Sequence, residues 1–124
     1  MESVDVIIPA YHPGQEFEKL LQSLENQKYP VKTILVMNTE EKYWNSQWEK
    51  KFPKVKAVHL KKQDFDHGGT RRWGASLSDA DIMVFMTQDA IPADDDLIGK
   101  LIRPIQENPK VGAAYARQLP KADC

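Results

Sequence analysis

Apolar positions follow two patterns along this chain, as short continuous runs and as longer segments with a helical period. Val, Ile and other residues that favour strands dominate the runs, and Pro, Asn or Gly residues flank several of them. Short runs of this kind are typical of β-strands. The pattern therefore predicts five strands, at residues 4–10, 33–37, 55–60, 82–86 and 111–116.

Helical spacing of apolar residues fills the segments between these runs and predicts helices at about residues 17–24, 40–52, 71–78 and 94–107. The last of these begins with Asp94 to Asp96, which suit the positive end of a helix, and we expect Pro104 to kink it or end it early. Strands that alternate with helices of about ten residues predict βαβ units with right-handed crossovers. The expected fold is a single Rossmann-like α/β domain, residues 1–124, with a parallel sheet and flanking helices.

Composition excludes several classes of protein. A chain of 124 residues with 41% hydrophobic and 28% charged residues can bury one core. Its 17 basic and 18 acidic residues provide no basic field, so nucleic acid is not an expected partner. The apolar runs are far shorter than the roughly 20 residues of a membrane span, and the first residues do not resemble a secretory signal. We therefore expect a cytoplasmic protein without a transmembrane segment.

One carboxylate is delivered directly to the edge of the predicted sheet. In parallel sheets, ligands bind outside the carboxyl ends of the strands, and Asp89 follows the buried strand at residues 82–86. A divalent cation that bridges two phosphates needs only one or two protein carboxylates, which Asp89 could supply. Spacing alone favours a simpler role for Asp89, as a turn or cap residue before Pro92.

A glycine pair opens the third predicted helix. Residues 66–70 (DHGGT) are expected to form a turn, and Arg71 lies on the first helical turn, where amide groups and a guanidinium could bind phosphate. Neither the Walker nor the dinucleotide glycine motif is present. An ordinary loop with solvated arginines and an exposed His67 is the alternative. Trp44 and Trp48 could form a sugar platform, but their spacing favours packing.

Three segments together resemble the family 2 glycosyltransferases, especially their rhamnosyltransferase-like branch. They are residues 4–11 (VDVIIPAY), 67–71 (HGGTR) and 85–90 (FMTQDA), and residues 117–120 (RQLP) extend the similarity. The resemblance implies a GT-A fold that binds a nucleotide diphosphosugar, with Mg²⁺ or Mn²⁺ on the diphosphate. The chain departs from the family pattern at two positions. The segment Gln88-Asp89-Ala90 has only one carboxylate, and Asn38 stands where the family usually has Asp.

The resemblance also implies which residues bind the donor. Pro9, Ala10 and Tyr11 match the loop beside the nucleoside, Arg71 the basic residue near the donor, and Asp89 the metal ligand. The full set of expected nucleotide-sugar-binding residues is Pro9, Ala10, Tyr11, Asn38, His67, Gly69, Arg71, Gln88 and Asp89, and the metal ligand is Asp89. The family's acceptor site and catalytic base lie beyond the fifth strand, so no catalytic residue is expected in this chain.

The expected function is transfer of a sugar, with rhamnose as the leading candidate, to an acceptor hydroxyl in polysaccharide or cell-surface glycan synthesis, with inversion. The chain would be the N-terminal, donor-binding part of a longer enzyme and inactive alone. A glycan or lipid-linked acceptor would bind the missing half, at the inner face of the membrane, and the uncovered surface would self-associate. Three alternatives are a non-catalytic nucleotide-binding module, a flavodoxin-like or receiver-type protein, and a structural interaction module.

Overall fold

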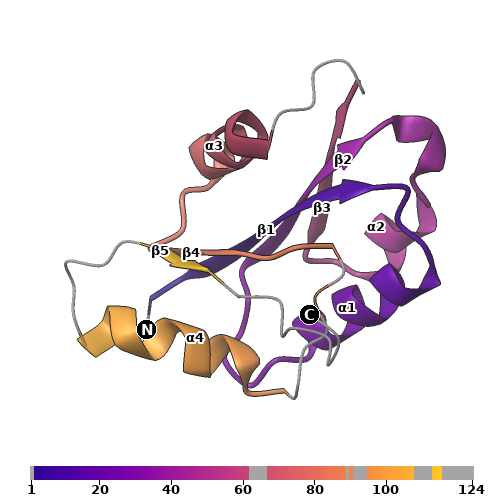
Figure 1. The fold of residues 1–124 in the computed structure, drawn as a ribbon. Helices are drawn as coiled ribbons and strands as arrows, with labels where there is room; N and C mark the ends of the chain where they lie inside the picture. Colours follow the sequence, from indigo (N-terminus) through magenta and orange to yellow (C-terminus); the bar gives the residue numbers. More distant parts are fainter. Residues whose placement is uncertain (1, 62–66, 89, 91–94, 108–112, 116–124) are drawn as a thin grey trace, which may run out of the picture.

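The computed structural model describes residues 2–61, 67–88, 90, 95–107 and 113–115. In this part of the chain five parallel strands form one sheet in the order β3-β2-β1-β4-β5. The strands are β1 (Val4–Tyr11), β2 (Thr33–Thr39), β3 (Val55–Leu60), β4 (Ile82–Phe85) and β5 (Ala113–Tyr115). The helices are α1 (Gln15–Glu25), the 3-10 helix η1 (Glu41–Tyr43), α2 (Gln47–Lys51), α3 (His67–Leu77) and α4 (Leu97–Glu107). The predicted parallel α/β fold is confirmed (Figure 1).

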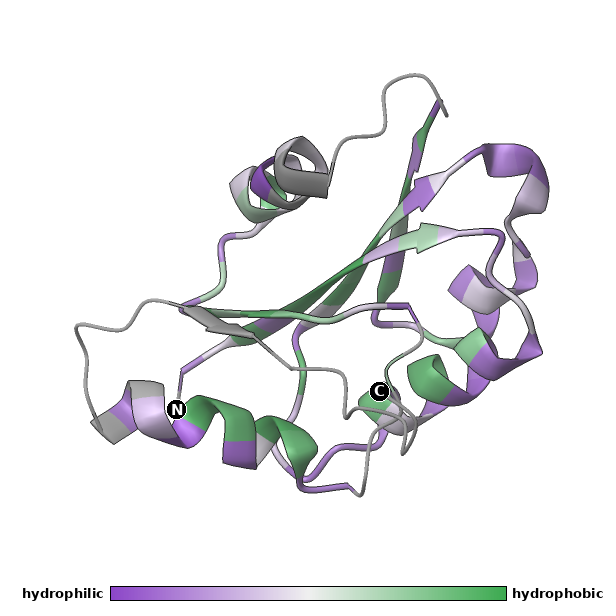
Figure 2. Cartoon of the chain, viewed as in Figure 1, coloured by the Kyte–Doolittle hydropathy of each residue, from purple (hydrophilic) through white to green (hydrophobic). Residues whose placement is uncertain are grey.

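Helices cover both faces of the sheet. The larger core joins Val6 and Ile8 of β1 to α1, α2 and α4, and the smaller core, on the α3 side, contains Ile7 of β1. Figure 2 shows the resulting distribution, with hydrophobic strands in the centre and polar residues on the outer sides of the helices. Because successive side chains of β1 enter different cores, this central strand is apolar on both faces.

Helix α3 lies unusually close to the sheet. A Cβ atom added to Gly74 would stand 2.7 Å from Cγ2 of Ile7 and 3.4 Å from Cγ of Met37. Only glycine permits this approach. The contact holds α3 over β1 and β2, with its first turn near the carboxyl edge, where β3 ends (Figure 1).

Residues 40–52 do not form the single helix that the sequence predicts. The 3-10 helix η1 and the short helix α2 are separated at Trp44, whose backbone is extended. The side chain of Asn45 accepts a hydrogen bond from the amide of Gln47 at 3.0 Å and so begins a new helix. The tryptophans nevertheless pack: Trp48 is buried, and the ring centroids of Trp44 and Trp48 are 5.0 Å apart. Packing, rather than a sugar platform, describes this pair.

Two predicted helix boundaries also change. Helix α3 begins at His67, so the glycine pair belongs to its first turn and not to a preceding turn. Helix α4 begins at Leu97, after Asp95 and Asp96, while Asp94 lies outside the described residues. Pro104 does not end α4, which continues to Glu107. Its position in the last turn removes only one internal hydrogen bond, which explains why the helix tolerates it.

One crossover has the opposite hand from the others. The chain steps from β1 to β2 through α1, and in the other direction from β4 to β5 through α4. Both helices lie on the same face, because Ile98 and Ile102 of α4 share the larger core with α1. Steps in opposite directions on one face have opposite hands, so the prediction of uniformly right-handed crossovers is wrong. Since β5 pairs over only three residues, strand twist constrains this connection less than the packing of α4.

Candidate functional site at the carboxyl edge of the sheet

The strand order reverses between β1 and β4, the position where parallel α/β sheets bind ligands. The two strand ends are joined here by a hydrogen bond from the amide of Tyr11 to Oε1 of Gln88, at 2.6 Å. Gln88 immediately precedes Asp89, which lies outside the described residues. The bond places the residue before the predicted metal ligand against the end of the predicted nucleoside loop.

The predicted nucleoside residues lie side by side on neighbouring strands. Strand register pairs Pro9 with Met37, Ala10 with Asn38 and Tyr11 with Thr39. Ala10 is buried, whereas the side chain of Tyr11 is 41% exposed. The fold therefore brings Pro9, Ala10, Tyr11, Asn38 and Gln88 together from three strand ends.

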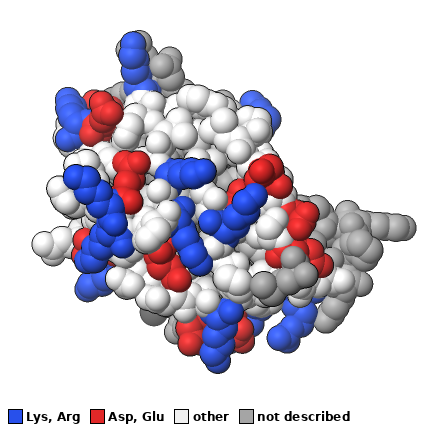
Figure 3. All heavy atoms as spheres, turned by 180° about the vertical axis from the view of Figure 1, so that it is seen from behind, with Lys and Arg blue, Asp and Glu red and all other residues white. Residues whose placement is uncertain are grey.

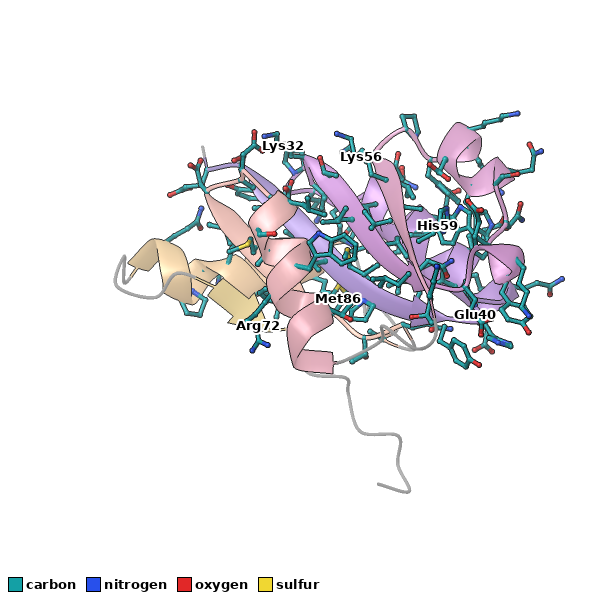
Figure 4. All side chains as sticks on the ribbon, turned by 90° about the horizontal axis from the view of Figure 1, so that it is seen from above. Lys32, Glu40, Lys56, His59, Arg72 and Met86 are labelled. Atoms are coloured by element: carbon teal, nitrogen blue, oxygen red, sulfur yellow. The ribbon has the colours of Figure 1, made fainter. Side chains whose placement is uncertain are left out.

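Asn38 is buried beneath the loop that follows β2. Its amide nitrogen donates to the carbonyl oxygen of Glu40 at 3.3 Å and lies 3.2 Å from Nδ1 of His59. Figure 4 shows Glu40 and His59 at the same end of the sheet. This geometry makes Asn38 a support for the loop, and its side chain does not reach the surface in this conformation.

Several polar atoms at this edge lack partners. Oδ1 of Asn38, Oγ1 of Thr39 and Oγ1 of Thr87 are buried and accept or donate no hydrogen bond among the described residues. Buried polar atoms are normally satisfied by protein, water or ligand. Asn38 and Thr39 end β2 and Thr87 follows β4, on the two sides of β1, so polar groups in need of partners flank the end of the central strand.

The predicted phosphate-binding residues lie at the start of α3. The backbone of His67 and Gly69 belongs to its first turn and that of Arg71 opens the second, while the side chains of His67 and Arg71 lie outside the described part. Arg72 is exposed and points away from the helix (Figure 4). The amino end of a helix attracts anions, so this turn stays a candidate phosphate site.

The predicted metal ligand, Asp89, lies outside the described residues, and among those residues no group of three potential ligands is found. The available donors suit a hard cation. Asp89 would supply a carboxylate oxygen, and the unpartnered hydroxyl of Thr87 lies two residues before it. Mg²⁺ or Mn²⁺ prefers such oxygen ligands and leaves coordination positions for phosphate.

Two residues at this edge are not among the expected donor-binding residues. Tyr43 fell inside a predicted helix and His12 just after the first predicted strand, yet their ring centroids are 3.5 Å apart. Tyr43 is 39% exposed. A tyrosine shortly after a strand end was the available signal, but the helical spacing of the neighbouring tryptophans concealed it.

Charges around the site are mixed. A hydrogen bond with Tyr43 and the nearby carboxylate of Glu40 raise the pKa of Lys42. On the face shown in Figure 3, basic and acidic side chains are interspersed. Local groups, rather than a field of one sign, must therefore provide any selectivity for an anionic ligand.

The arrangement of strands and helices places the chain among GT-A and nucleotidyltransferase-like α/β folds. It is similar to a CMP:2-keto-3-deoxy-manno-octonic acid synthetase complexed with CTP, with a TM-score of 0.68 at 14% identity over 88% of this chain and 49% of that one. It is also similar to S. aureus TarS, with a TM-score of 0.65 at 18% identity over 97% of this chain and 23% of that one. At these identities the similarity concerns the fold alone.

The chain belongs to glycosyl transferase family 2, whose sequence profile matches residues 5–123. Over 97% of its length it is 34% identical to the O-antigen chain rhamnosyltransferase RfbN of Salmonella typhimurium, and over 99% it is 28% identical to the O-antigen chain rhamnosyltransferase WbaN of Salmonella anatum. It spans 38% and 39% of these relatives. The predicted family and its rhamnosyltransferase-like branch are thus confirmed.

Within the described residues, none of the helices is long and apolar enough to cross a membrane.

Proposed function

We propose that this chain is the donor-binding part of an inverting glycosyltransferase that transfers rhamnose from a nucleotide diphosphosugar to an acceptor hydroxyl in cell-surface glycan synthesis. Family membership and similarity to two O-antigen rhamnosyltransferases support this proposal. The structural observation that carries it is the bond between Tyr11 and Gln88 at the reversal of strand order, directly before Asp89.

Each part of the edge has a proposed role. Pro9, Ala10 and Tyr11 contact the nucleoside, and Asn38, buried at the end of β2, supports the loop beside them through its hydrogen bond to Glu40. Gly69 and Arg71, with His67, bind the diphosphate at the amino end of α3, because amides and a guanidinium are strong donors to phosphate oxygens.

Asp89, with Gln88 beside it, holds Mg²⁺ or Mn²⁺. When bound, such an ion offsets the charge that develops on the departing diphosphate.

The acceptor, a glycan or a lipid-linked sugar, and the base that deprotonates its hydroxyl are assigned to the remainder of a longer enzyme. Alone, the chain would bind the donor but not turn over, and it would self-associate through surface that the remainder covers. The proposed location is the cytoplasm, at the inner face of the membrane.

Thermal unfolding with a panel of donors tests this function. The panel contains dTDP-, UDP- and GDP-linked sugars, each with and without Mn²⁺. A donor at about 100 times its dissociation constant that binds only the folded chain should stabilise it by about 2.7 kcal/mol. We expect one class of donor to raise the melting temperature in a metal-dependent way, and Asp89→Ala to abolish the metal-dependent part.

Asp95→Ala is the matched control. This substitution removes the same charge from an exposed position before α4, where Asp95 lies 3.8 Å from the ammonium group of Lys28. Donor-induced stabilisation should survive it. Absence of a shift with every donor, or equal losses in both variants, would contradict the proposed donor and metal site.

A further inference from the structure

Three aromatic rings gather where β1 and the loop after β2 reach the carboxyl edge. The ring of His12 lies between those of Tyr11 and Tyr43, with centroid distances of 4.1 Å and 3.5 Å. It is inclined by only 31° to the Tyr43 ring and by 54° to the Tyr11 ring. His12 therefore stacks on Tyr43 and covers part of one face of that ring, and Tyr11 stands at its other side.

Hydrogen bonds to the ends of β2 and β3 hold the loop that carries Tyr43. Glu40 has a left-handed backbone, with φ of 68°. Its amide donates to the carbonyl oxygen of Leu60 at 2.7 Å, and its own carbonyl oxygen accepts a hydrogen bond from the buried side chain of Asn38. The same carbonyl accepts from the amide of Tyr43 at 3.1 Å. Asn38 thus positions Tyr43 through the carbonyl oxygen of Glu40, to which both residues donate.

The other side of the cluster is formed by Tyr11 and His12, at the end of β1 and directly after it. His12 has φ of 49°, a left-handed conformation that is uncommon for residues other than glycine. Its side chain is exposed, as are those of Tyr11 and Tyr43. A planar ring that displaced the His12 side chain would stack on the face of Tyr43 and contact the Tyr11 ring at its edge. The backbone of His12 would then be free to leave its uncommon conformation.

We propose that Tyr43 is a stacking surface for the base of the nucleotide donor and that His12 occupies this surface in the free protein. The inference rests on the proposed donor-binding function and adds to it a specific surface and a competing side chain. Stacking on an aromatic ring tolerates every base, because each base has a π-face. His12 therefore weakens the binding of all nucleotides, while other groups select among them.

Calorimetric titration of the chain with UDP, dTDP and GDP in the presence of Mn²⁺ tests the proposal, with inorganic pyrophosphate as the probe that lacks a base. His12→Ala should bind nucleotides severalfold more tightly and pyrophosphate equally well. Tyr43→Ala should weaken nucleotide binding by about tenfold, and Tyr43→Phe should retain it, because stacking needs the ring and not the hydroxyl. Increased affinity in His12→Ala cannot result from damage to the fold.

Trp73→Ala is the matched control, since Trp73 is 44% exposed on α3 and outside the cluster. It should leave nucleotide affinity unchanged. If nucleotides bind the wild-type chain but His12→Ala and Tyr43→Ala leave their affinity unchanged, the stacking surface is wrong and the donor function stands. If no nucleotide binds either the wild-type chain or His12→Ala, both proposals are overturned.

Discussion

Replacement of Gly74 by alanine should weaken the fold, although alanine favours helices. The new Cβ would stand 2.7 Å from Cγ2 of Ile7, and ordinary contact begins at 3.4 Å, so the two atoms would be 0.7 Å too close. Ile7 is fully buried and β-branched in the central strand, which limits its movement. Overpacking costs about 1–3 kcal/mol and the helix propensity of alanine returns about 1 kcal/mol. Because the site is rigid, we expect a net loss of about 1–2 kcal/mol.

Urea unfolding followed by circular dichroism measures this loss. With a slope of about 2 kcal/mol per molar urea, the midpoint should fall by about 0.5–1 M without a change in slope. Gly14→Ala is the matched control, because an added Cβ there has no neighbour within 4 Å. Gly14 is the N-cap of α1, where alanine is less favourable than glycine, so this variant should lose about 0.5 kcal/mol, less than Gly74→Ala. Equal midpoints for the two variants, or a more stable Gly74→Ala, would refute the argument that α3 is held by this close approach.

Two further predictions concern the amino edge of the sheet. Ser78→Ala removes the hydroxyl that donates to the buried carboxylate of Asp5 at 2.7 Å, and should destabilise the chain by about 1–3 kcal/mol in the same urea assay; Ser76→Ala, at an exposed position, should not. Lys32 donates to Asp79 at 2.6 Å and lowers its pKa, so Lys32→Met should raise that pKa in an NMR titration. The pair stabilises the fold at neutral pH, and this contribution disappears as the pH falls through the lowered pKa. An unchanged Asp79 titration would refute the ion pair, and the stability effect should be small because both groups are exposed.

Much of the candidate site follows from local sequence. The strand at residues 4–11 ends in Pro9, Ala10 and Tyr11, and the apolar strand at residues 82–85 is soon followed by Gln88. In a parallel sheet these ends must share one edge, so their common location was predictable. The contact between Tyr11 and Gln88 was not, because it joins residues 77 positions apart and depends on which strands are neighbours.

A local side-chain hydrogen bond also overrode the helical periodicity of residues 40–52. Trp44, Trp48 and Phe52 have the spacing of one helix, but the side chain of Asn45 starts a new helix and leaves Trp44 extended. The break frees Tyr43 to reach His12. A period-based prediction cannot detect this change, because Trp44, Trp48 and Phe52 pack against the same core in either arrangement.

The sequence by itself determined the class of fold and the family, because strand and helix periods, turn residues and the motifs at residues 4–11, 67–71 and 85–90 are local properties. Only the tertiary structure decided the order of strands, the hand of the α4 crossover, the close approach of α3 at Gly74 and the aromatic cluster around His12. These features depend on side chains from distant segments that compete for the same space. Packing, which no single segment contains, settles that competition.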